Sequence, residues 1–422
     1  MIDIEKIRRN PEKFREAIKN KRVPLDLDEL LQIDQERRRL TDLVNRLRQE
    51  RNRLSQLVAH GAAPRDENIA AARQLGEQLS ADETALAEVE QRCAQLMAIA
   101  PGLPVEGVPL GETDKENVEI RRHGDCAARP NWFRDHLEIG KMHRMIEFDG
   151  ARLIAGSRAY ALQGAGVMLE MAVLRFALDQ LVAKNFVPVC PPLLVRHEAM
   201  YGTGYFPLGD DNAYEFERDK LYLTGTSEVG TVAMHMNKIF DCADLPQRFA
   251  GISACFRREA GAAGKDTRGL YRVHQFQKVE QVVFCENDEE LSAKIHYELL
   301  QNAEDILRAL ELPYRVVAVC TGDMGLGQVL KHDIETWMPS REAYGETHSC
   351  SSFHDFQARR LGIKYRDADE RKKFVFTLNN TAIASPRILI ALLENHQNED
   401  GSINVPFALR PYLGQRSRLE LP

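Results

Sequence analysis

Four short segments alternate polar and apolar residues, so on a strand each would gather polar side chains on one face. Arg258 would point to the other face of its segment. Polar faces of this kind seldom pack into a core without partners. The grouped residues are Ser253, Cys255, Arg257 and Glu259; Phe276, Lys278 and Glu280; Thr224, Thr226 and Glu228; and Thr377, Asn379 and Thr381.

A basic, glycine-containing loop joins the first two segments. A flexible loop of this composition suits a polyanion such as a triphosphate or an RNA 3′ end. It is neither a Walker loop nor a strand-to-helix dinucleotide turn. A solvent-exposed hairpin tip is the alternative reading. The loop residues are Gly261, Gly264, Lys265, Arg268, Gly269 and Arg272.

A second candidate anion-binding feature lies just before the segment ILIALLENHQ. Ser385 suits an N-cap and Pro386 the first helical position, so Arg387 falls in the first turn of the predicted helix. There the helix dipole and the guanidinium act together on an anion.

Length and composition limit the class of protein. The chain has 422 residues, which allows two or three domains, and 63 acidic against 56 basic residues give a net charge of -7. This balance excludes a basic nucleic-acid coat protein. The eight cysteines form no C-x-x-C pair, so reduced thiols and no zinc are expected. No run is apolar enough for a membrane span, and we expect a cytoplasmic protein.

The first hundred residues predict a long helical hairpin. Residues 27–98 contain one proline and no aromatic residue, and HGAAPRD at 60–66 supplies the turn between two limbs. Each limb has one apolar seam with helical spacing, so the limbs should pair antiparallel. The seams are Leu40, Leu43, Leu47, Leu54 and Leu57, and Leu75, Leu79, Leu86, Val89, Cys93 and Leu96.

The first limb is the basic one. Residues 31–60 hold seven arginines against four acidic residues, whereas residues 61–98 hold three against seven. Arginine's forked donors suit phosphates and base edges. Alternatively, the acidic second limb satisfies these arginines on a solvated surface.

After a proline- and glycine-rich linker at 101–111, strands and helices mix. Helices are predicted at 169–182 and 289–310. Strands are predicted in VPVCPPLLV, LYLTGTSEV, RFAGISACFRRE, QFQKVEQVVFCE, VVAVC and KKFVFTLNN. Strands joined by a hairpin predict an α+β fold, an antiparallel sheet with flanking helices, in a domain at 112–422 after an N-terminal domain at 1–100.

At this point the residues resemble a known family. FRREAGAAGKDTRGLYRVHQFQKVE resembles motif 2 of class II aminoacyl-tRNA synthetases in their seryl form, TLNNTAIASPRILIALLENHQ resembles motif 3, and NFVPVCPPLL resembles motif 1. The opening MIDIEKIRRNPEKF and the helical hairpin are similar to the tRNA-binding arm of the bacterial seryl enzymes. The resemblance covers nearly the whole chain. It implies activation of L-serine with ATP, followed by transfer to tRNA(Ser), and also to tRNA(Sec).

The resemblance assigns ATP contacts residue by residue. Arg257 would hold the α-phosphate, Glu259 would read the adenine amino group, Phe276 would stack on adenine, and Arg272 and Arg387 would hold the distal phosphates. These three arginines are the expected catalytic residues. The full expected ATP set is Arg257, Arg258, Glu259, Val273, His274, Gln275, Phe276, Glu346, Thr347, His348, Ser349 and Arg387.

Glu346 and Ser349 would hold Mg²⁺. Their spacing of three does not fit one face of a straight strand, so a bend or bulge is required. Histidines 274, 332 and 348 are read as structural, because the reaction needs no base. The expected serine-binding residues are Thr226, Ser227, Glu228, Glu280, Asn379 and Thr381. Here T-S-E stands where T-A-E is frequent in the family, and N-N-T-A where N-G-S-G is frequent.

The resemblance also implies partners. A homodimer is expected, with Pro192 at its interface. The expected tRNA contacts are Arg37, Arg38, Arg46, Arg48, Arg51 and Arg53. Two alternatives remain: a carrier-protein aminoacyl ligase, which in this family lacks the long arm, and a non-catalytic paralogue, which would have lost ATP-binding residues.

Overall fold

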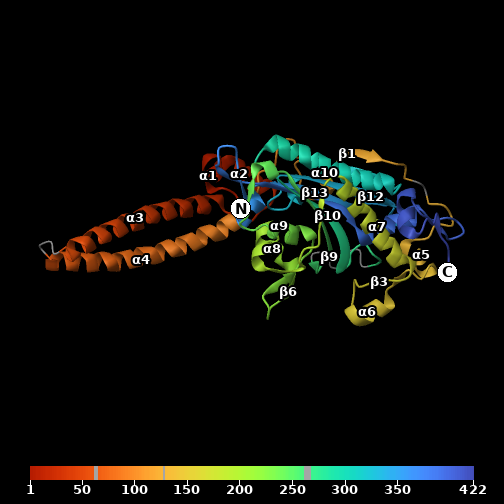
Figure 1. Cartoon of the computed structure of the whole chain (residues 1–422), viewed down its shortest axis with the longest axis horizontal. Helices are drawn as coiled ribbons and strands as arrows, with labels where there is room; N and C mark the ends of the chain where they lie inside the picture. The colour runs from red at the N-terminus through yellow and green to blue at the C-terminus, as the bar shows by residue number, and fades with distance from the viewer. Residues whose placement is uncertain (61–64, 127–128, 261–267) are drawn as a thin grey trace. The chain divides into compact units, whose positions relative to one another are not determined.

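The computed structural model describes residues 1–60, 65–126, 129–260 and 268–422. The chain forms two compact units, Met1–Pro101 and Gly102–Pro422 (Figure 1). Four residues of the predicted turn at 60–66, and Gly261, Gly264 and Lys265 of the basic loop, lie outside the described residues.

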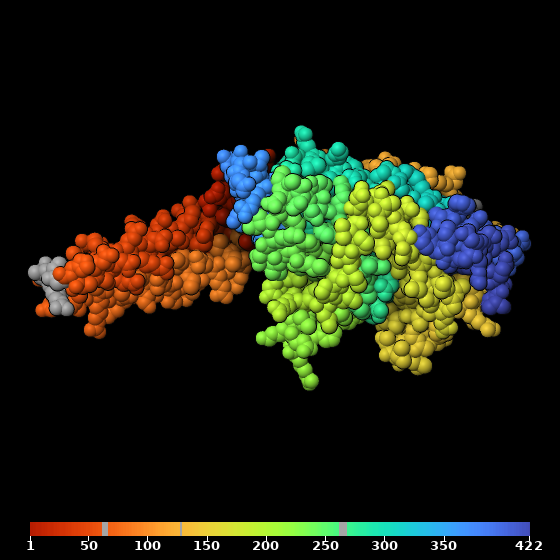
Figure 2. All heavy atoms as spheres, in the orientation of Figure 1, coloured from red at the N-terminus to blue at the C-terminus, as the bar shows by residue number. Residues whose placement is uncertain are grey.

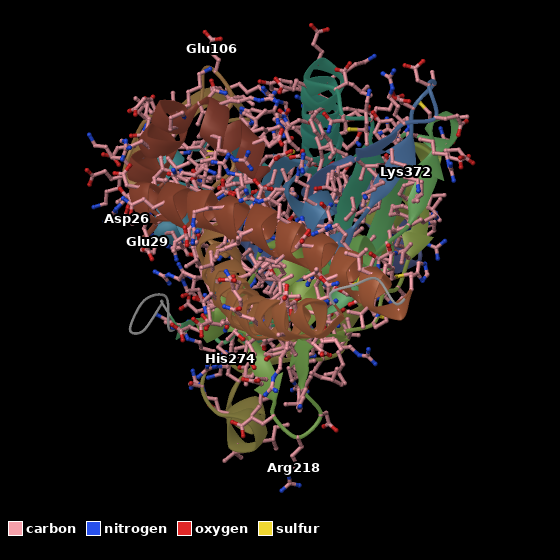
Figure 3. The ribbon with its side chains drawn as sticks, turned by 90° about the vertical axis from the view of Figure 1, so that its left-hand side faces the viewer. Asp26, Glu29, Glu106, Arg218, His274 and Lys372 are labelled. Carbon is pink, nitrogen blue, oxygen red and sulfur yellow. The ribbon has the colours of Figure 1, made fainter. Side chains whose placement is uncertain are left out.

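The first unit is helical, as predicted. The long helix that begins at Leu27 is capped by Asp26, whose carboxylate accepts from the amides of Asp28 and Glu29. Asp26 and Glu29 are labelled in Figure 3. The helices are α1 (Ile4–Arg9), α2 (Pro11–Asn20), α3 (Leu27–Ala59) and α4 (Arg65–Ala98).

Helices α3 and α4 pair antiparallel, which confirms the hairpin (Figure 1). Arg48 of α3 pairs with Glu83 of α4 at 2.8 Å, while Arg92 of α4 pairs with Glu29 of α3. Of the predicted seam residues, Leu40 and Leu54 on α3 and Leu79, Cys93 and Leu96 on α4 are buried, and so is Val44, which the prediction did not include. The apolar seam therefore holds the limbs together, as the spacing predicted.

The second unit is built on an eight-stranded sheet in the order β1-β11-β12-β13-β16-β10-β9-β4. Every neighbouring pair is antiparallel except β4 with β9. The antiparallel prediction is thus confirmed apart from this edge pair. The strands are β1 (Val118–His123), β4 (Val187–Val189), β9 (Gln247–Phe256), β10 (Gln275–Cys285), β11 (Tyr314–Ala318), β12 (Leu330–Met338), β13 (Ala343–His354) and β16 (Phe376–Ala384).

Smaller elements surround this sheet. The helices are α5 (His136–Met142), α6 (Asp149–Ala155), α7 (Ala165–Ala183), α8 (His197–Thr203), α9 (Ser227–Ala233), α10 (Glu289–Ala309), α11 (Phe356–Leu361) and α12 (Ser385–Asn395). The short strands are β2 (Ile146–Glu147), β3 (Ala161–Leu162), β5 (Leu194–Arg196), β6 (Tyr214–Phe216), β7 (Leu221–Leu223), β8 (Ile239–Asp241), β14 (Lys364–Arg366), β15 (Lys372–Phe374), β17 (Ile403–Asn404) and β18 (Arg418–Leu419). Short 3-10 helices lie at Asp114–Glu116, Asp210–Asn212, Cys242–Asp244, Thr321–Asp323, Pro339–Arg341 and Phe407–Leu413.

Helices α7, α10 and α12 pack against the sheet and bury its apolar residues in one core. The buried side chains of Gln281 and Asn380 on two central strands both donate to the Leu299 carbonyl of α10, which gives both side-chain amino groups a partner. The outward side of α7 lies on the surface of the unit, in yellow in Figure 2. The other face carries the polar side chains and, beside them, a second apolar cluster in which Val282 and Phe284 of β10 pack against α9 and α11.

Three local predictions need correction. LYLTGTSEV is not one strand: β7 ends at Leu223, Thr226 caps α9, and Glu228 lies within that helix. Because a helix replaces the strand, the alternation of Thr224, Thr226 and Glu228 fails there. KKFVFTLNN forms two strands, β15 and β16. Ser385 is the first residue of α12 rather than its N-cap, and its hydroxyl accepts from the Gln277 amide instead.

All eight cysteines are free, and five of them are buried. Within the described ranges, no helix is long and apolar enough to cross a membrane.

Asp34, which is fully buried in the first unit, yields a stability prediction. Its carboxylate meets Arg8 at 2.9 Å, Arg37 at 2.8 Å and Arg38 at 3.4 Å. In Asp34→Asn these partly exposed arginines lose their anion, which should destabilise α3 by about 1–3 kcal/mol. Hydrogen exchange of the α3 amides, measured by mass spectrometry on the full chain, should accelerate roughly tenfold or more. The exposed control Asp42→Asn should leave it unchanged, and equal protection in both variants would contradict the prediction.

Candidate active site

The polar face of the sheet gathers the predicted residues of three strands. Strand register sets Ser253 opposite Lys278, Cys255 opposite Phe276, and Glu280 opposite Thr381. Opposed residues share a face, so the period-two prediction is confirmed for β9, β10 and β16.

Two carboxylates occupy this face. Glu280 pairs with Lys278 at 2.5 Å and accepts from the Thr381 hydroxyl at 3.4 Å. Glu228 reaches the same region from α9, accepting from Gln357 at 2.7 Å. All of these side chains are buried. Two nearby carboxylates with one lysine leave a net negative group, which suits a small cation such as an ammonium.

Burial, and after it the charge of Glu280, raise the pKa of Glu228 to about 7. Hydrogen bonds from Gln357 and Asn379 and the charge of Lys278 act in the opposite direction. Burial also raises the pKa of Glu280, opposed mainly by Lys278. Burial therefore leaves Glu228 only partly ionised near neutral pH, and the hydrogen bonds from Gln357 and Asn379 oppose that loss of charge.

Arg257 follows directly after β9. Its guanidinium carbon lies 5.2 Å from the Phe276 ring centroid, and its Nε donates to the Gly225 carbonyl at 3.5 Å. The Arg257 amide donates to the His274 carbonyl, and His274 Nδ1 meets the Arg257 carbonyl, both at 2.9 Å. This backbone pairing fixes the point from which the guanidinium extends.

Glu259 lies beyond the end of the strand. Its φ of 54° shows that the strand alternation does not continue to it. Its carboxylate instead pairs with Arg272 at 3.1 Å. Arg258 and Gln275 are exposed, whereas Val273 is buried.

Arg387 extends from the first turn of α12, as predicted. It donates to the Tyr271 carbonyl at 3.1 Å and the Glu346 carbonyl at 2.6 Å, and it meets the Glu346 carboxylate at 3.4 Å. Its guanidinium also lies 4.4 Å from the Tyr271 ring centroid. These contacts bring the third predicted arginine to the strand that carries Glu346.

The predicted irregularity between Glu346 and Ser349 is present. His348 pairs with Ile334 and Glu346 with Glu335, so Thr347 is an extra residue opposite no partner. This bulge moves Glu346 to the face that Ser349 shares with Asp333. The prediction of a bend or bulge is confirmed.

These oxygens are hard ligands of the type that Mg²⁺ accepts. Among the described residues, no group of three or more His, Cys, Asp or Glu forms a metal cage. Mg²⁺ commonly takes one or two carboxylates together with substrate phosphates, and Glu346, 48% exposed in its side chain, fits that mode.

The remaining predicted residues around the bulge are buried. Thr347 bonds the Thr336 hydroxyl at 2.7 Å, and His348 contacts Thr347 Oγ1 at 2.8 Å and the Ala382 carbonyl at 3.0 Å. Burial lowers the pKa of His348 to about 4. His332 likewise bonds a buried neighbour, His296, at 2.8 Å.

Sequence reasoning missed four polar residues near this face. Lys278 was placed on the face but not in the site, although its period-two spacing from Glu280 signals the pair. Lys331 and Asp333 pair at 3.1 Å, and burial raises the pKa of Asp333 to about 6. Gln357 lies on a helix far along the chain, so no strand spacing signals it.

The arginines predicted to contact tRNA differ in their ion-pair partners. Arg37 and Arg38 pair with Asp34, and Arg53 with Glu50, all within α3. Of the six predicted tRNA contacts, Arg48 is the one whose salt bridge reaches α4. In the described ranges no acidic side chain pairs with Arg46 or Arg51. The acidic second limb therefore does not neutralise the basic face as a whole.

Pro192 is exposed between β4 and β5. Exposed apolar side chains occur on elements near it in sequence: Met168 and Met171 on α7, Val187 on β4, and Leu194 on β5.

Comparison with known proteins follows the two units. Residues 214–396 match the model of the tRNA synthetase class II core domain (G, H, P, S and T), and residues 1–104 match that of the seryl-tRNA synthetase N-terminal domain. The serine–tRNA ligase of Deinococcus radiodurans is 48% identical over 100% of both chains, and that of Thermodesulfovibrio yellowstonii is 41% identical over 98% and 99%.

Solved structures agree. Seryl-tRNA synthetase from Pyrococcus horikoshii complexed with ATP matches with a TM-score of 0.93 and 37% identity over 100% of both chains. The cytoplasmic serine–tRNA ligase of Naegleria fowleri in complex with AMP matches with a TM-score of 0.86 and 28% identity over 98% and 96%. The antiparallel sheet with its polar face is thus the catalytic core of a class II aminoacyl-tRNA synthetase. Within that class, the chain belongs to the seryl-tRNA synthetase family.

The raised pKa of Glu228 predicts a pH-dependent cost to stability. An unfolded glutamate titrates near 4.5 and the folded one near 7, so the unfolded state loses its proton first and stability falls as pH rises between these values. Glu228→Gln should therefore be more stable than the parent by about 2–3 kcal/mol at pH 8, with little difference at pH 4.5.

Urea unfolding followed by tryptophan fluorescence measures this effect, since both tryptophans, 132 and 337, lie in the second unit. The exposed control Glu217→Gln should change stability by less than about 0.5 kcal/mol at either pH. If Glu228→Gln is no more stable to urea than the parent at pH 8, burial does not destabilise the ionised Glu228 carboxylate.

Proposed function

We propose that the polar face of the sheet is where this chain, as a serine–tRNA ligase, activates L-serine with ATP and then charges tRNA(Ser). The serine carboxylate attacks the ATP α-phosphorus, the bond to pyrophosphate breaks, and seryl-adenylate forms. A terminal ribose hydroxyl of tRNA then attacks the seryl carbonyl and releases AMP. The observation that carries the proposal is that Arg257, Arg387 and the Glu228–Glu280 pair come together on one face in a chain of this family.

ATP binding is assigned to the end of β9, the start of β10 and the first turn of α12. Arg257 meets the α-phosphate, Phe276 stacks on adenine and Glu259 reads its amino group. Arg272 and Arg387 hold the distal phosphates. Catalysis comes from orientation and neutralisation of charge, because the reaction needs no covalent nucleophile. The family member from Pyrococcus horikoshii, solved with ATP, supports ATP as the substrate.

Mg²⁺ is assigned to Glu346 and Ser349. The bulge at Thr347 supports this proposal, because it turns both oxygen ligands to one face beside Arg387. When bound there, Mg²⁺ supplies positive charge to the phosphates of ATP.

Serine binding is assigned to Thr226, Glu228, Glu280, Asn379 and Thr381. The carboxylates meet the ammonium and hydroxyl groups, and such a site discriminates better than an apolar pocket. Ser227 donates to the Gly251 carbonyl at 3.0 Å, which supports a role in fixing the start of α9 against β9.

The α3–α4 arm is assigned to tRNA. Its exposed arginines, with Arg46 and Arg51 outside any described ion pair, support contacts to phosphate. tRNA(Sec) is proposed as a second substrate of the same arm. A carrier-protein ligase is less well supported, because residues 1–104 match the seryl N-terminal domain. A non-catalytic paralogue is opposed by the retention of Arg257, Glu259, Phe276, Glu346 and Arg387.

We propose a homodimer with Pro192 at its interface. The exposed apolar side chains of α7, β4 and β5 support it, since a patch of this kind suits a protein partner.

Arg257→Ala should reduce serine-dependent ATP–pyrophosphate exchange by about 10²–10³-fold, because it removes the charge at the α-phosphate. The matched control is Arg218→Ala, at the tip of the hairpin between β6 and β7 (Figure 3). Exchange with threonine, alanine and glycine tests the substrate. Near-parent exchange by a folded Arg257→Ala protein would refute the assignment of this arginine, and no exchange with serine by the parent would refute the function.

Shortening the arm should separate the two half-reactions. Because Arg48 and Glu83 are in contact, residues 49–82 can be replaced by a short Gly-Ser turn. Pyrophosphate exchange should be unchanged, whereas kcat/KM for charging tRNA(Ser) should fall by about 100-fold through lost phosphate contacts. The milder pair is Arg51→Glu against Arg73→Glu on α4. Full charging by the shortened protein would refute the arm's role.

A further inference from the structure

Gln357 of α11 is 1% exposed, and its whole amide is engaged next to the proposed serine pocket. Its Nε2 donates to Glu228 Oε1 at 2.7 Å and to the Thr203 carbonyl at 3.0 Å. Its Oε1 accepts from the Thr377 hydroxyl at 2.7 Å. Both amide hydrogens and the carbonyl oxygen therefore have partners.

The partners fix the direction of the amide. The Thr203 carbonyl oxygen is an acceptor only, and so is an ionised Glu228 carboxylate. Exchanging the amide oxygen and nitrogen would place an acceptor against both. Nε2 must therefore face Glu228, and the Thr377 hydroxyl must donate to Oε1.

The helix that carries Gln357 is itself anchored. Arg359 pairs with Asp355 across one turn at 2.8 Å. Arg360 donates to the Tyr201 carbonyl at 2.6 Å and to the Phe206 carbonyl at 3.0 Å, which ties α11 to α8 and the loop after it. The amide of Gln357 is thus presented from a rigid support.

We propose that Gln357 is a positioning residue for serine recognition, whose amide holds the Glu228 carboxylate ionised and aimed at the amino group of the substrate. The inference rests on the proposed function of Glu228. It assigns to the DFQARR segment, Asp355 to Arg360, a task in substrate binding although Gln357 contacts the substrate only through Glu228.

Neighbouring groups act on the pKa of Glu228 in opposite directions, so the loss of one hydrogen bond shifts its protonation. Burial and the Glu280 carboxylate on β10 favour the neutral acid. Lys278 on β10, Asn379 on β16 and Gln357 on α11 favour the carboxylate. The phenol of Tyr205 also lies near the pair, and burial keeps it neutral by raising its pKa. With a Glu228 pKa of about 7, loss of the Gln357 donor moves the balance toward the neutral acid at physiological pH.

The test is Gln357→Met, which keeps the side chain's length without its hydrogen bonds. The KM for serine in pyrophosphate exchange should rise about tenfold or more at pH 7, while the KM for ATP stays within about twofold. The ratio of variant to parent serine KM should be larger at pH 6.5 than at pH 9, because high pH ionises Glu228 in both proteins. The matched control is Gln301→Met, an exposed glutamine of α10.

A packing defect alone would raise the serine KM equally at every pH. A folded Gln357→Met protein with a parental serine KM, or with a pH-independent increase, overturns the proposal. If that variant does not fold by tryptophan fluorescence, Thr377→Val replaces it, since it removes the donor that orients the amide. The same pH-dependent increase, smaller in size, is then expected, and its absence overturns the proposal. Failure of the proposed function is seen separately, as lack of serine-dependent exchange in the parent.

Discussion

The structure depends on keeping charged groups ionised where water is largely excluded. Glu228, Glu280 and Lys278 are all buried on the polar face of the sheet, and burial raises the pKa of the two carboxyl groups, which favours their neutral forms. The pairing of Lys278 with Glu280 and the amides around Glu228 oppose that tendency. The opposite face is covered by α7, α10 and α12, which bury an apolar core and receive the bonds from Gln281 and Asn380 at the Leu299 carbonyl of α10.

The arginines meet a different constraint, since they must face anions and yet be held in place. Each is held through backbone groups: Arg257 by its pairing with His274, and Arg387 by the carbonyls of Tyr271 and Glu346. Carbonyl oxygens hold a guanidinium without neutralising it, while the Glu346 carboxylate, 3.4 Å from Arg387, partly offsets the charge of that arginine. The bulge at Thr347 turns Glu346 toward Arg387, while the pairing of β12 with β13 continues on both sides of it.

The arm follows simpler physics. An apolar seam holds α3 to α4, and its arginines pair mostly along α3, so its basic surface remains available on the outside. Each limb of the hairpin carries its helical pattern locally, whereas the catalytic unit depends on strands far apart in the sequence. This difference explains why the structure of the arm was easier to predict from the sequence than that of the catalytic unit.

The sequence by itself determined the helical hairpin, the strands β9, β10 and β16, the shared faces of Phe276, Lys278 and Glu280 and of Asn379 and Thr381, and the need for a bulge before Ser349. Those features follow from local periodicity, which each segment carries within itself. Tertiary structure alone decided that Thr226 and Glu228 start a helix, that Glu259 turns to Arg272, and that Gln357 meets Glu228. The first two depend on where the chain turns, and the third depends on a contact between residues 129 positions apart, about which local spacing carries no information.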